Sequence, residues 1–319
     1  MTQHEANKRG TLGKKAGGAR PPESEVEIDP SEYGYPRLPT DADESDHDDS
    51  TELVDGGATV GGEEKSPTAT VRLDRSALLH VDRSLVVVNK PSGVLAAPGR
   101  GGHAQLSELV RGAAGWGTHE PLRLVHRLDR GASGVMLYAR TVEAQRALVA
   151  DFMERRIEKV YHALVSGFVV EDGEVKLALK FDKRQNRMTI ARSGGKPAHT
   201  LFRILERVAG NTLLECRPVT GRTHQIRVHM AAIGHPLTVD TMYGGGQSVL
   251  LSHYKADYRP SGRHPERPLI SRLTLHARRI EFRHPESGEP VVFEAPLPRD
   301  LAAAVRQLGR VRSVEKRAR

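Results

Sequence analysis

Residues 123–140 read RLVHRLDRGASGVMLYAR, and they join an acidic side chain to an apolar run. The second half, residues 134–139, is typical of a short buried β-strand. The acid, Asp129, lies between Arg127 and Arg130 and is followed by a glycine-containing loop. Glycines in such a loop let another backbone or a ligand approach closely. The stretch therefore predicts a carboxylate on a tight loop that leads into a strand of a sheet.

The neighbouring cations favour the ionised carboxylate and so lower the expected pKa of Asp129. An ionised carboxylate on such a loop can act as a nucleophile or as a general base. The same features fit an aspartate that caps the loop within a surface ion pair, which is the commoner use of such a residue. On this segment alone, both interpretations stay open.

Further apolar runs on both sides of this stretch predict more strands, some of them joined by hairpin turns. The predicted strands are 84–89, 134–139, 160–169, 175–181, 201–208, 212–217, 273–282 and 291–295. Apolar residues at helical spacing predict helices at 141–155, with Thr141 as N-cap, at 223–233, stopped by Gly234, and over 301–308. Many hairpin-joined strands with few helices indicate an α+β fold, a mostly antiparallel mixed sheet with packed helices.

The net charge of +8 over 319 residues conceals an uneven division along the chain. Residues 23–64 carry fifteen acids and one base, whereas residues 65–319 carry 42 bases and 24 acids. The opening segment also has few apolar residues, so it cannot bury enough surface to offset its chain entropy. We expect residues 1–67 to be disordered, 68–309 to form a single domain, and 310–319 to be a basic tail.

The acidic stretch 41–50 has two interpretations. It is a solvated tail, as most like-charge blocks are, or it competes within the molecule for the basic domain. No apolar run is long enough for a transmembrane helix, and the first residues lack the apolar centre of a secretory signal. The single cysteine, Cys216, excludes an internal disulfide and favours a reduced, cytoplasmic location.

Residues 158–167, EKVYHALVSG, form the second segment with chemical potential. Strand alternation places Lys159 and Tyr161 on one face. A tyrosine beside a lysine can stack on a base and transfer a proton. The alternative is a half-buried strand tyrosine covered by the lysine stem, which is common.

The third segment, residues 220–230, reads TGRTHQIRVHM and carries a polar cluster into the start of a helix. The free N–H groups and positive dipole end of a helix start favour phosphate, although the same residues also fit a solvated, capped helix. The cluster comprises Arg222, Thr223, His224, Gln225 and Arg227. His224 and His229 lie five residues apart, which does not match the helical zinc motif, and we predict no metal site.

The three segments appear together and in an order that resembles a known family. HRLDRGASG at 126–134 is similar to the catalytic signature of the RluA-type pseudouridine synthases, whose usual form is His-Arg-Leu-Asp followed by Ser-Gly. The resemblance extends over roughly residues 75–308 through DRSLVVVNKPSG, KVYHALVSG, GRTHQIRVHM and GHPLTVDTMYGG. It implies an enzyme that converts uridine in RNA to pseudouridine without a cofactor or metal, with 68–309 as its catalytic domain.

The resemblance also implies roles for individual residues. Asp129 matches the essential aspartate, Tyr161 the active-site tyrosine that packs on the base, and Arg227 the basic residue that pairs with the aspartate. Arg127 matches a residue that fills the gap left by the flipped uridine. We further expect substrate binding by Arg127, His126, Arg222, His224, Gln225 and Lys159. Ala132 departs from the family, where threonine is usual, and the missing hydroxyl is expected to have a modest effect.

Several alternatives remain at this stage. The basic stretch 245–268 fits an RNA contact and a variable surface loop equally well. The acidic residues 1–64 do not resemble an RNA-binding domain, so target recognition is expected to rest on the catalytic domain. Competing functions are RNA binding without catalysis and hydrolysis of a nucleoside or glycoside through Asp129, although a glycosidase needs a second carboxylate. We expect a monomer that acts on ribosomal or transfer RNA and does not associate with membranes.

Overall fold

The structure is a computed structural model, and it describes residues 72–97, 105–259 and 264–311. The predictions for residues 1–67, for most of the tail at 310–319 and for part of the 245–268 stretch lie outside these ranges. None of the helices in the described ranges has the length and apolar composition needed to cross a membrane.

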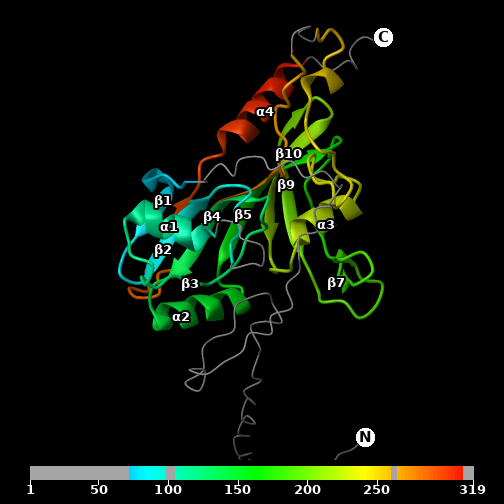
Figure 1. Ribbon diagram of the computed structural model, residues 1–319. Coiled ribbons are helices and arrows are strands. Elements are labelled where there is room, and N and C mark those ends of the chain that lie inside the picture. The colour runs from blue at the N-terminus through cyan, green and yellow to red at the C-terminus, as the bar shows by residue number, and fades with distance from the viewer. Residues whose placement is uncertain (1–71, 98–104, 260–263, 312–319) are drawn as a thin grey trace, which may run out of the picture.

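A ten-stranded mixed sheet forms the centre of the molecule (Figure 1). Its main path runs β1-β2-β4-β11-β5-β10-β9-β6, with β3 beside β4 and β12 beside β11. All its pairings are antiparallel except β4 with β11, which are parallel. The strands are β1 (Leu78–Val81), β2 (Leu85–Lys90), β3 (Arg123–Leu124), β4 (Ser133–Ala139), β5 (Glu158–Ser166), β6 (Gly173–Val175), β9 (Thr200–Val208), β10 (Asn211–Pro218), β11 (Leu275–Arg283) and β12 (Pro290–Glu294).

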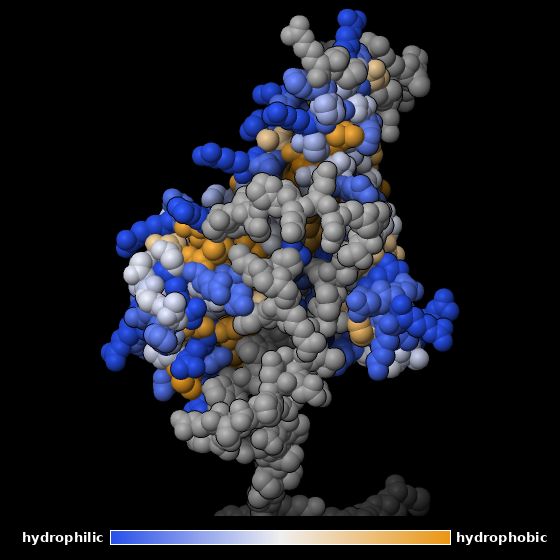
Figure 2. Space-filling model, viewed as in Figure 1, coloured by the Kyte–Doolittle hydropathy of each residue, from blue (hydrophilic) through white to orange (hydrophobic). Residues whose placement is uncertain are grey.

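A separate two-stranded hairpin and a small number of helices complete the described fold. Strands β7 and β8 pair with each other outside the main sheet. Hydrophilic side chains gather on this hairpin in the space-filling view, at the lower right (Figure 2). The remaining elements are β7 (Leu179–Asp182), β8 (Arg187–Ile190), α1 (Leu106–Ala114), α2 (Val142–Met153), α3 (Gln225–Ala232), α4 (Arg299–Arg310) and the 3-10 turns η2 (Arg75–Ala77) and η3 (Leu251–His253).

Strand β4 is buried along its whole length because helices cover both of its faces. Val135 and Leu137 pack with the apolar side of α2 on one face. Met136 and Tyr138 pack with α1 on the other. This explains why the sequence of β4 is a continuous apolar run and does not alternate with polar residues.

The other half of the sheet is covered by α3 and α4. Ile226 and Met230 of α3 pack against β5 and β10. Leu301 and Val305 of α4 pack on a separate cluster near the β9–β10 turn. Helix α3 is therefore fixed against the sheet by its own apolar residues.

Most predicted elements match the observed ones. Both hairpins form, and the side chain of Thr141 accepts a hydrogen bond from the Ala144 N–H as the N-cap of α2. The strand predicted over 175–181 is wrong, because the chain leaves the main sheet after β6 and pairs again only as β7. Helix α3 begins at Gln225, two residues later than predicted, because His224 has a left-handed backbone with φ 53°.

Candidate active site

Asp129 lies on the loop between β3 and β4, and the buried side chain of Lys90 anchors this loop by hydrogen bonds. The Lys90 ammonium, at the end of β2, donates to the carbonyl oxygens of Pro91, Arg130 and Ala132 at 3.0, 3.1 and 2.8 Å. The side chain is fully buried, and this burial lowers the pKa of Lys90 to about 7. The loop that presents Asp129 is thus tied to the first long strand of the sheet.

A close backbone approach fixes the far end of the same loop. Gly134 has φ +116°, a conformation that favours glycine, and a Cβ there would collide with the Ala277 backbone of β11. The neighbouring Ser133 hydroxyl hydrogen-bonds Nδ1 of His276 at 3.0 Å, and both side chains are buried. Only glycine at position 134 therefore allows β4 to pair with β11 next to the loop that carries Asp129.

His126 supports the loop from within the core. Its Nε2 accepts a hydrogen bond from the backbone N–H of Leu137 at 3.0 Å, and its ring packs on Phe152 at a centroid distance of 4.8 Å. Burial, helped by the charge of Lys159, lowers the pKa of His126 to about 3, which keeps the ring neutral. Its accepting nitrogen is used within the fold, so the geometry gives His126 a supporting position rather than a free substrate-binding group.

One cleft brings together all nine residues predicted for the site. Its walls come from the β3–β4 loop, β5, the segment after β10 and the start of α3. The nine residues are Asp129, Tyr161, Arg227, Arg127, His126, Arg222, His224, Gln225 and Lys159. The sequence segments that contain them are well separated along the chain, and the sheet order makes them neighbours.

Arg227, in the first half of α3, forms an ion pair with Asp129. Its Nη1 donates to Oδ2 of Asp129 at 3.1 Å. The same guanidinium donates through Nε and Nη2 to both carboxylate oxygens of Asp240, at 2.8 and 3.0 Å. The Arg227 side chain is only 6% exposed and that of Asp240 1%, whereas Asp129 is 20% exposed and faces the cleft. One buried cation thus joins a buried acid to an accessible one.

His224 is the second cationic partner available to Asp129 when its ring is protonated. Its Nε2 lies 3.8 Å from Oδ1 of Asp129, and its Nδ1 hydrogen-bonds the Tyr243 hydroxyl at 2.8 Å. Burial raises the pKa of Asp129, but the charges of His224 and Arg227 outweigh this effect and hold the pKa below its usual range. The carboxylate is therefore ionised at neutral pH.

Tyr161 and Lys159 lie two residues apart on β5 and form another part of the cleft wall. Tyr161 is half-buried and packs against two core clusters. The Lys159 ammonium lies over the Phe152 ring, 5.4 Å from its centroid, and burial lowers its pKa to about 8. Both residues line the cleft, as the alternation of β5 predicts.

The remaining predicted residues differ in how accessible their polar atoms are. Arg127 is exposed at the cleft, and Arg222 donates through Nε to the carbonyl oxygen of Pro197 at 3.1 Å. Gln225 is buried, and both ends of its amide form hydrogen bonds within the protein, including one from the Thr220 hydroxyl at 2.6 Å. Gln225 therefore orders the segment before α3, while Arg127 faces a potential ligand.

Sequence reasoning missed Asp240, Tyr243 and the role of Lys90. In the sequence, Lys90 and Asp240 appear only within the stretches DRSLVVVNKPSG and GHPLTVDTMYGG that resemble the family, and neither is given a role there. A lysine that directly ends an apolar strand is the signal available for Lys90. For Asp240 the sequence carries no such signal, because its partner Arg227 is reached only through the turn after α3.

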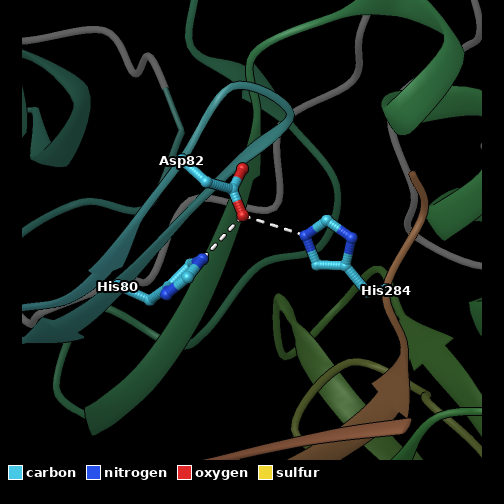
Figure 3. Close-up of side chains that lie close together, drawn as sticks. All are labelled: His80, Asp82 and His284. Atoms are coloured by element: carbon cyan, nitrogen blue, oxygen red, sulfur yellow. Dashed lines mark hydrogen bonds and ion pairs between the residues drawn. The ribbon is translucent and has the colours of Figure 1, made fainter. Parts of the chain in front are cut away.

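Three side chains outside the cleft converge in a way that raises the question of a metal site. Within the described residues, His80, Asp82 and His284 offer ligand atoms within 4.8 Å of one another (Figure 3). Oδ2 of Asp82 lies 2.6 Å from Nε2 of His80 and 2.9 Å from Nε2 of His284. Figure 3 shows both rings pointing at this one oxygen.

The hydrogen bonds of His284 do not fit a metal. Its Nδ1 faces the backbone N–H groups of Glu286 and Ser287 at 3.3 and 3.2 Å, so Nδ1 accepts and the proton of the neutral ring is on Nε2. A metal bound at Nε2 needs that proton on Nδ1 instead. The cluster fits a hydrogen-bonded clamp in which Asp82 joins the β1–β2 turn to the end of β11.

Comparison with known proteins places the chain in a family. Residues 84–232 match the family model described as RNA pseudouridylate synthase. The chain is 40% identical over 222 residues to the dual-specificity RNA pseudouridine synthase RluA of Pasteurella multocida, covering 69% of this chain and 92% of that protein. The chain belongs to the RNA pseudouridylate synthase family.

Other relatives and solved structures agree with this assignment. The ribosomal large subunit pseudouridine synthase D of Neisseria meningitidis serogroup B is 37% identical over 227 residues, or 70% of this chain. The chain spans 59% of the length of that curated relative. The structure of human RNA pseudouridylate synthase domain containing 1 superposes with a TM-score of 0.55 and 28% identity, covering 72% of this chain and 86% of that one. The expected α+β fold is confirmed.

Proposed function

We propose that this protein is an RNA pseudouridine synthase in which Asp129 is the catalytic carboxylate. The observation that carries the proposal is the geometry of Asp129, which is ionised, paired with Arg227 at 3.1 Å and presented to a cleft that Tyr161 also lines. Relatives named as RNA pseudouridine synthases support the reaction class.

The proposed reaction is an isomerisation. The C1′–N1 glycosidic bond of a uridine breaks, the uracil turns, and C5 bonds to C1′. C5 loses a proton and N1 gains one, so the composition of the RNA does not change. Asp129 either attacks the sugar as a nucleophile or removes a proton from it, and Tyr161 packs on the base and assists loss of the C5 proton.

The surroundings of the cleft suit an RNA substrate. Arg127 is exposed at the cleft, where it can occupy the gap that a flipped uridine leaves in the stack. The nearby β7–β8 hairpin exposes Lys180, Arg184 and Gln185, and cations such as the first two bind phosphates. His126 and Gln225 act in this proposal by ordering the walls of the cleft.

Ribosomal RNA and transfer RNA are both proposed targets. The Neisseria relative is named for the large ribosomal subunit, and the Pasteurella relative is named as dual-specific. We further propose that the protein works as a monomer in the cytoplasm. Sedimentation of the purified chain, alone and with RNA, tests the monomeric state.

The decisive experiment compares wild type with Asp129→Asn and with the control Glu171→Gln, which makes the same chemical change at an exposed site outside the cleft. We expect wild type and Glu171→Gln to form pseudouridine in RNA from cells that lack the modification. Asp129→Asn should bind the RNA and form none.

Nucleoside analysis of the treated RNA distinguishes the alternatives. Release of free uracil would indicate a hydrolase, and RNA binding without any pseudouridine in the wild type would indicate a non-catalytic binder. Full activity of Asp129→Asn would remove Asp129 from the mechanism.

A further inference from the structure

Lys90 and Lys159 both hold their ammonium groups in shielded places, but only Lys90 has its hydrogen bonds satisfied. Lys90 donates to three backbone carbonyl oxygens. Lys159 lines the cleft, and within the part of the chain that the structure describes its ammonium forms no hydrogen bond and no ion pair. Its neighbour is the face of the Phe152 ring, whose centroid is 5.4 Å away. A shielded cation without an anion is costly, so this site suits an anionic ligand.

The acidic residues nearest to Lys159 in sequence are paired with other cations. Glu154 forms an ion pair with Arg156. Glu158, the residue directly before Lys159, lies 3.3 Å from the guanidinium of Arg217 on β10. Both carboxylates are therefore committed elsewhere, and neither neutralises the ammonium in the cleft.

Arg155, in the turn between α2 and β5, adds a second positive charge near Lys159. Burial lowers the pKa of Lys159 to about 8, and the charge of Arg155 contributes to this shift. The Arg155 side chain is exposed, and among the described residues it also has no hydrogen bond and no carboxylate partner. Two like charges repel each other, and an anion that contacts both removes the repulsion.

We propose that Lys159 and Arg155 form a phosphate subsite of the cleft, which binds a phosphodiester beside the target uridine. The inference rests on the proposed function, which makes RNA the ligand. The phosphodiester is the anionic group of an RNA chain, whereas uracil offers neutral carbonyl oxygens. Lys159 and Tyr161 are about 6.6 Å apart along β5. A nucleotide whose base packs on Tyr161 can therefore bring its own phosphate to Lys159.

The charge of Lys159 can be changed by pH without changing the other groups that face it. These groups are Arg155 from the turn after α2, His126 from the loop before β4, and Tyr161 from the same strand. His126 stays neutral because its pKa is lowered to about 3, and an arginine keeps its proton. Lys159 loses its charge as the pH rises through about 8, and phosphate binding weakens in the same direction.

The test measures binding of a fluorescently labelled oligouridylate to wild type, Lys159→Met and Lys159→Arg at several salt concentrations. We expect Lys159→Met to weaken binding on the order of tenfold. Its logarithmic dependence of affinity on salt should become shallower by about 0.7, for the one phosphate that is no longer neutralised. Wild type should lose up to about tenfold in affinity between pH 7 and pH 9. Lys159→Arg should keep the wild-type salt slope and lose this pH dependence.

Lys176→Met is the matched control, because it makes the same chemical change at an exposed lysine outside the cleft. We expect its affinity to stay within about twofold of wild type. Single-turnover pseudouridine formation, in RNA from cells that lack the modification, adds a second measurement. A phosphate held equally before and during the reaction affects binding and not chemistry. Lys159→Met should therefore need more RNA to saturate and then reach nearly the wild-type rate.

Each outcome supports or overturns the subsite. Unchanged affinity in Lys159→Met overturns it, and so does weaker binding with an unchanged salt slope, which would assign Lys159 to a neutral group of the base. A lower rate at saturating RNA with unchanged affinity also overturns it. If Lys159→Met does not fold, Lys159→Arg decides, and a wild-type pH dependence in that variant overturns the subsite. If wild type forms no pseudouridine while the binding results hold, the proposed function fails and the anion site stands.

Discussion

His126 is a buried neutral imidazole whose protonation state is coupled to folding. In the folded protein its pKa is lowered to about 3, because burial disfavours the charged ring. An unfolded chain binds the proton near pH 6.5. Between these values the unfolded state holds one more proton than the folded state. The stability contributed by neutral His126 is therefore complete above about pH 6.5 and declines as the pH falls toward 3.

We predict that the free energy of unfolding of wild type falls more steeply with acid than that of His126→Gln. Each pH unit below about 6.5 costs about 1.4 kcal/mol at this one residue. The variant is less stable than wild type at pH 7.5 because it loses the ring packing on Phe152 and alters the hydrogen bond to the Leu137 N–H, at a cost of about 1–3 kcal/mol. The difference in unfolding free energy between wild type and variant should be about 2 kcal/mol smaller at pH 5 than at pH 7.5. Urea titrations at both pH values measure this difference. A difference that is the same at both pH values would contradict a neutral, buried His126.

For individual residues, the sequence predicts a role only where the neighbours along the chain indicate it. Asp129 stands out because arginines flank it in sequence, and Tyr161 and Lys159 follow from strand alternation. Asp240 does not, because its environment is created by Arg227 arriving from a helix. The hydrogen bonds that occupy Gln225 are hidden in the same way, since they reach back to His199 and Thr200.

The same distinction holds for whole elements. The two long hairpins are predictable because alternation and turn residues are local signals. Helix α1 is missed because its N-cap, Gln105, makes no side-chain hydrogen bond and Gly112 lies within it. The end of β6 and most of β7 are predicted as one strand, and β8 is not predicted at all. The reason is that the chain leaves one sheet and starts another within a few residues. That choice depends on packing against α3, which the local sequence does not encode.

The β7–β8 hairpin allows a test of RNA binding at the level of one element. Lys183 and Arg184 lie at its turn, between the two strands. We predict that Lys183→Glu combined with Arg184→Glu weakens RNA binding. The logarithmic dependence of affinity on salt should become shallower by about 0.7–0.9 for each phosphate that the hairpin no longer neutralises. Anisotropy titrations at several salt concentrations measure this slope.

The control for the hairpin carries the same charge change on α4. Arg306 and Arg310 are exposed there, on the helix that Figure 1 shows far from β7. Arg306→Glu with Arg310→Glu should leave the slope closer to wild type. Equally weakened binding in both double variants would mean that affinity reflects the overall charge and not the hairpin.

For the whole molecule, the separation of charge along the chain has a measurable effect. Residues 1–64 include the acidic segment, and their removal raises the net charge from +8 to the +18 carried by residues 65–319. We predict that the shortened chain binds RNA more tightly at about 50 mM salt, and that the difference narrows at about 200 mM because salt screens it. Equal affinities at low salt would identify the segment as a solvated tail.

The position of β11 has a consequence for how the protein is made. This strand lies between β4 and β5, yet its residues, Leu275–Arg283, follow both strands far along the chain. A ribosome therefore releases the Asp129 loop, Tyr161 and Arg227 well before the strand that holds the two halves together. Long-range closure of this kind is a late step in folding. A nascent chain can therefore carry all three of these side chains while it still lacks β11, and we expect the cleft to form only after residue 283 has left the ribosome.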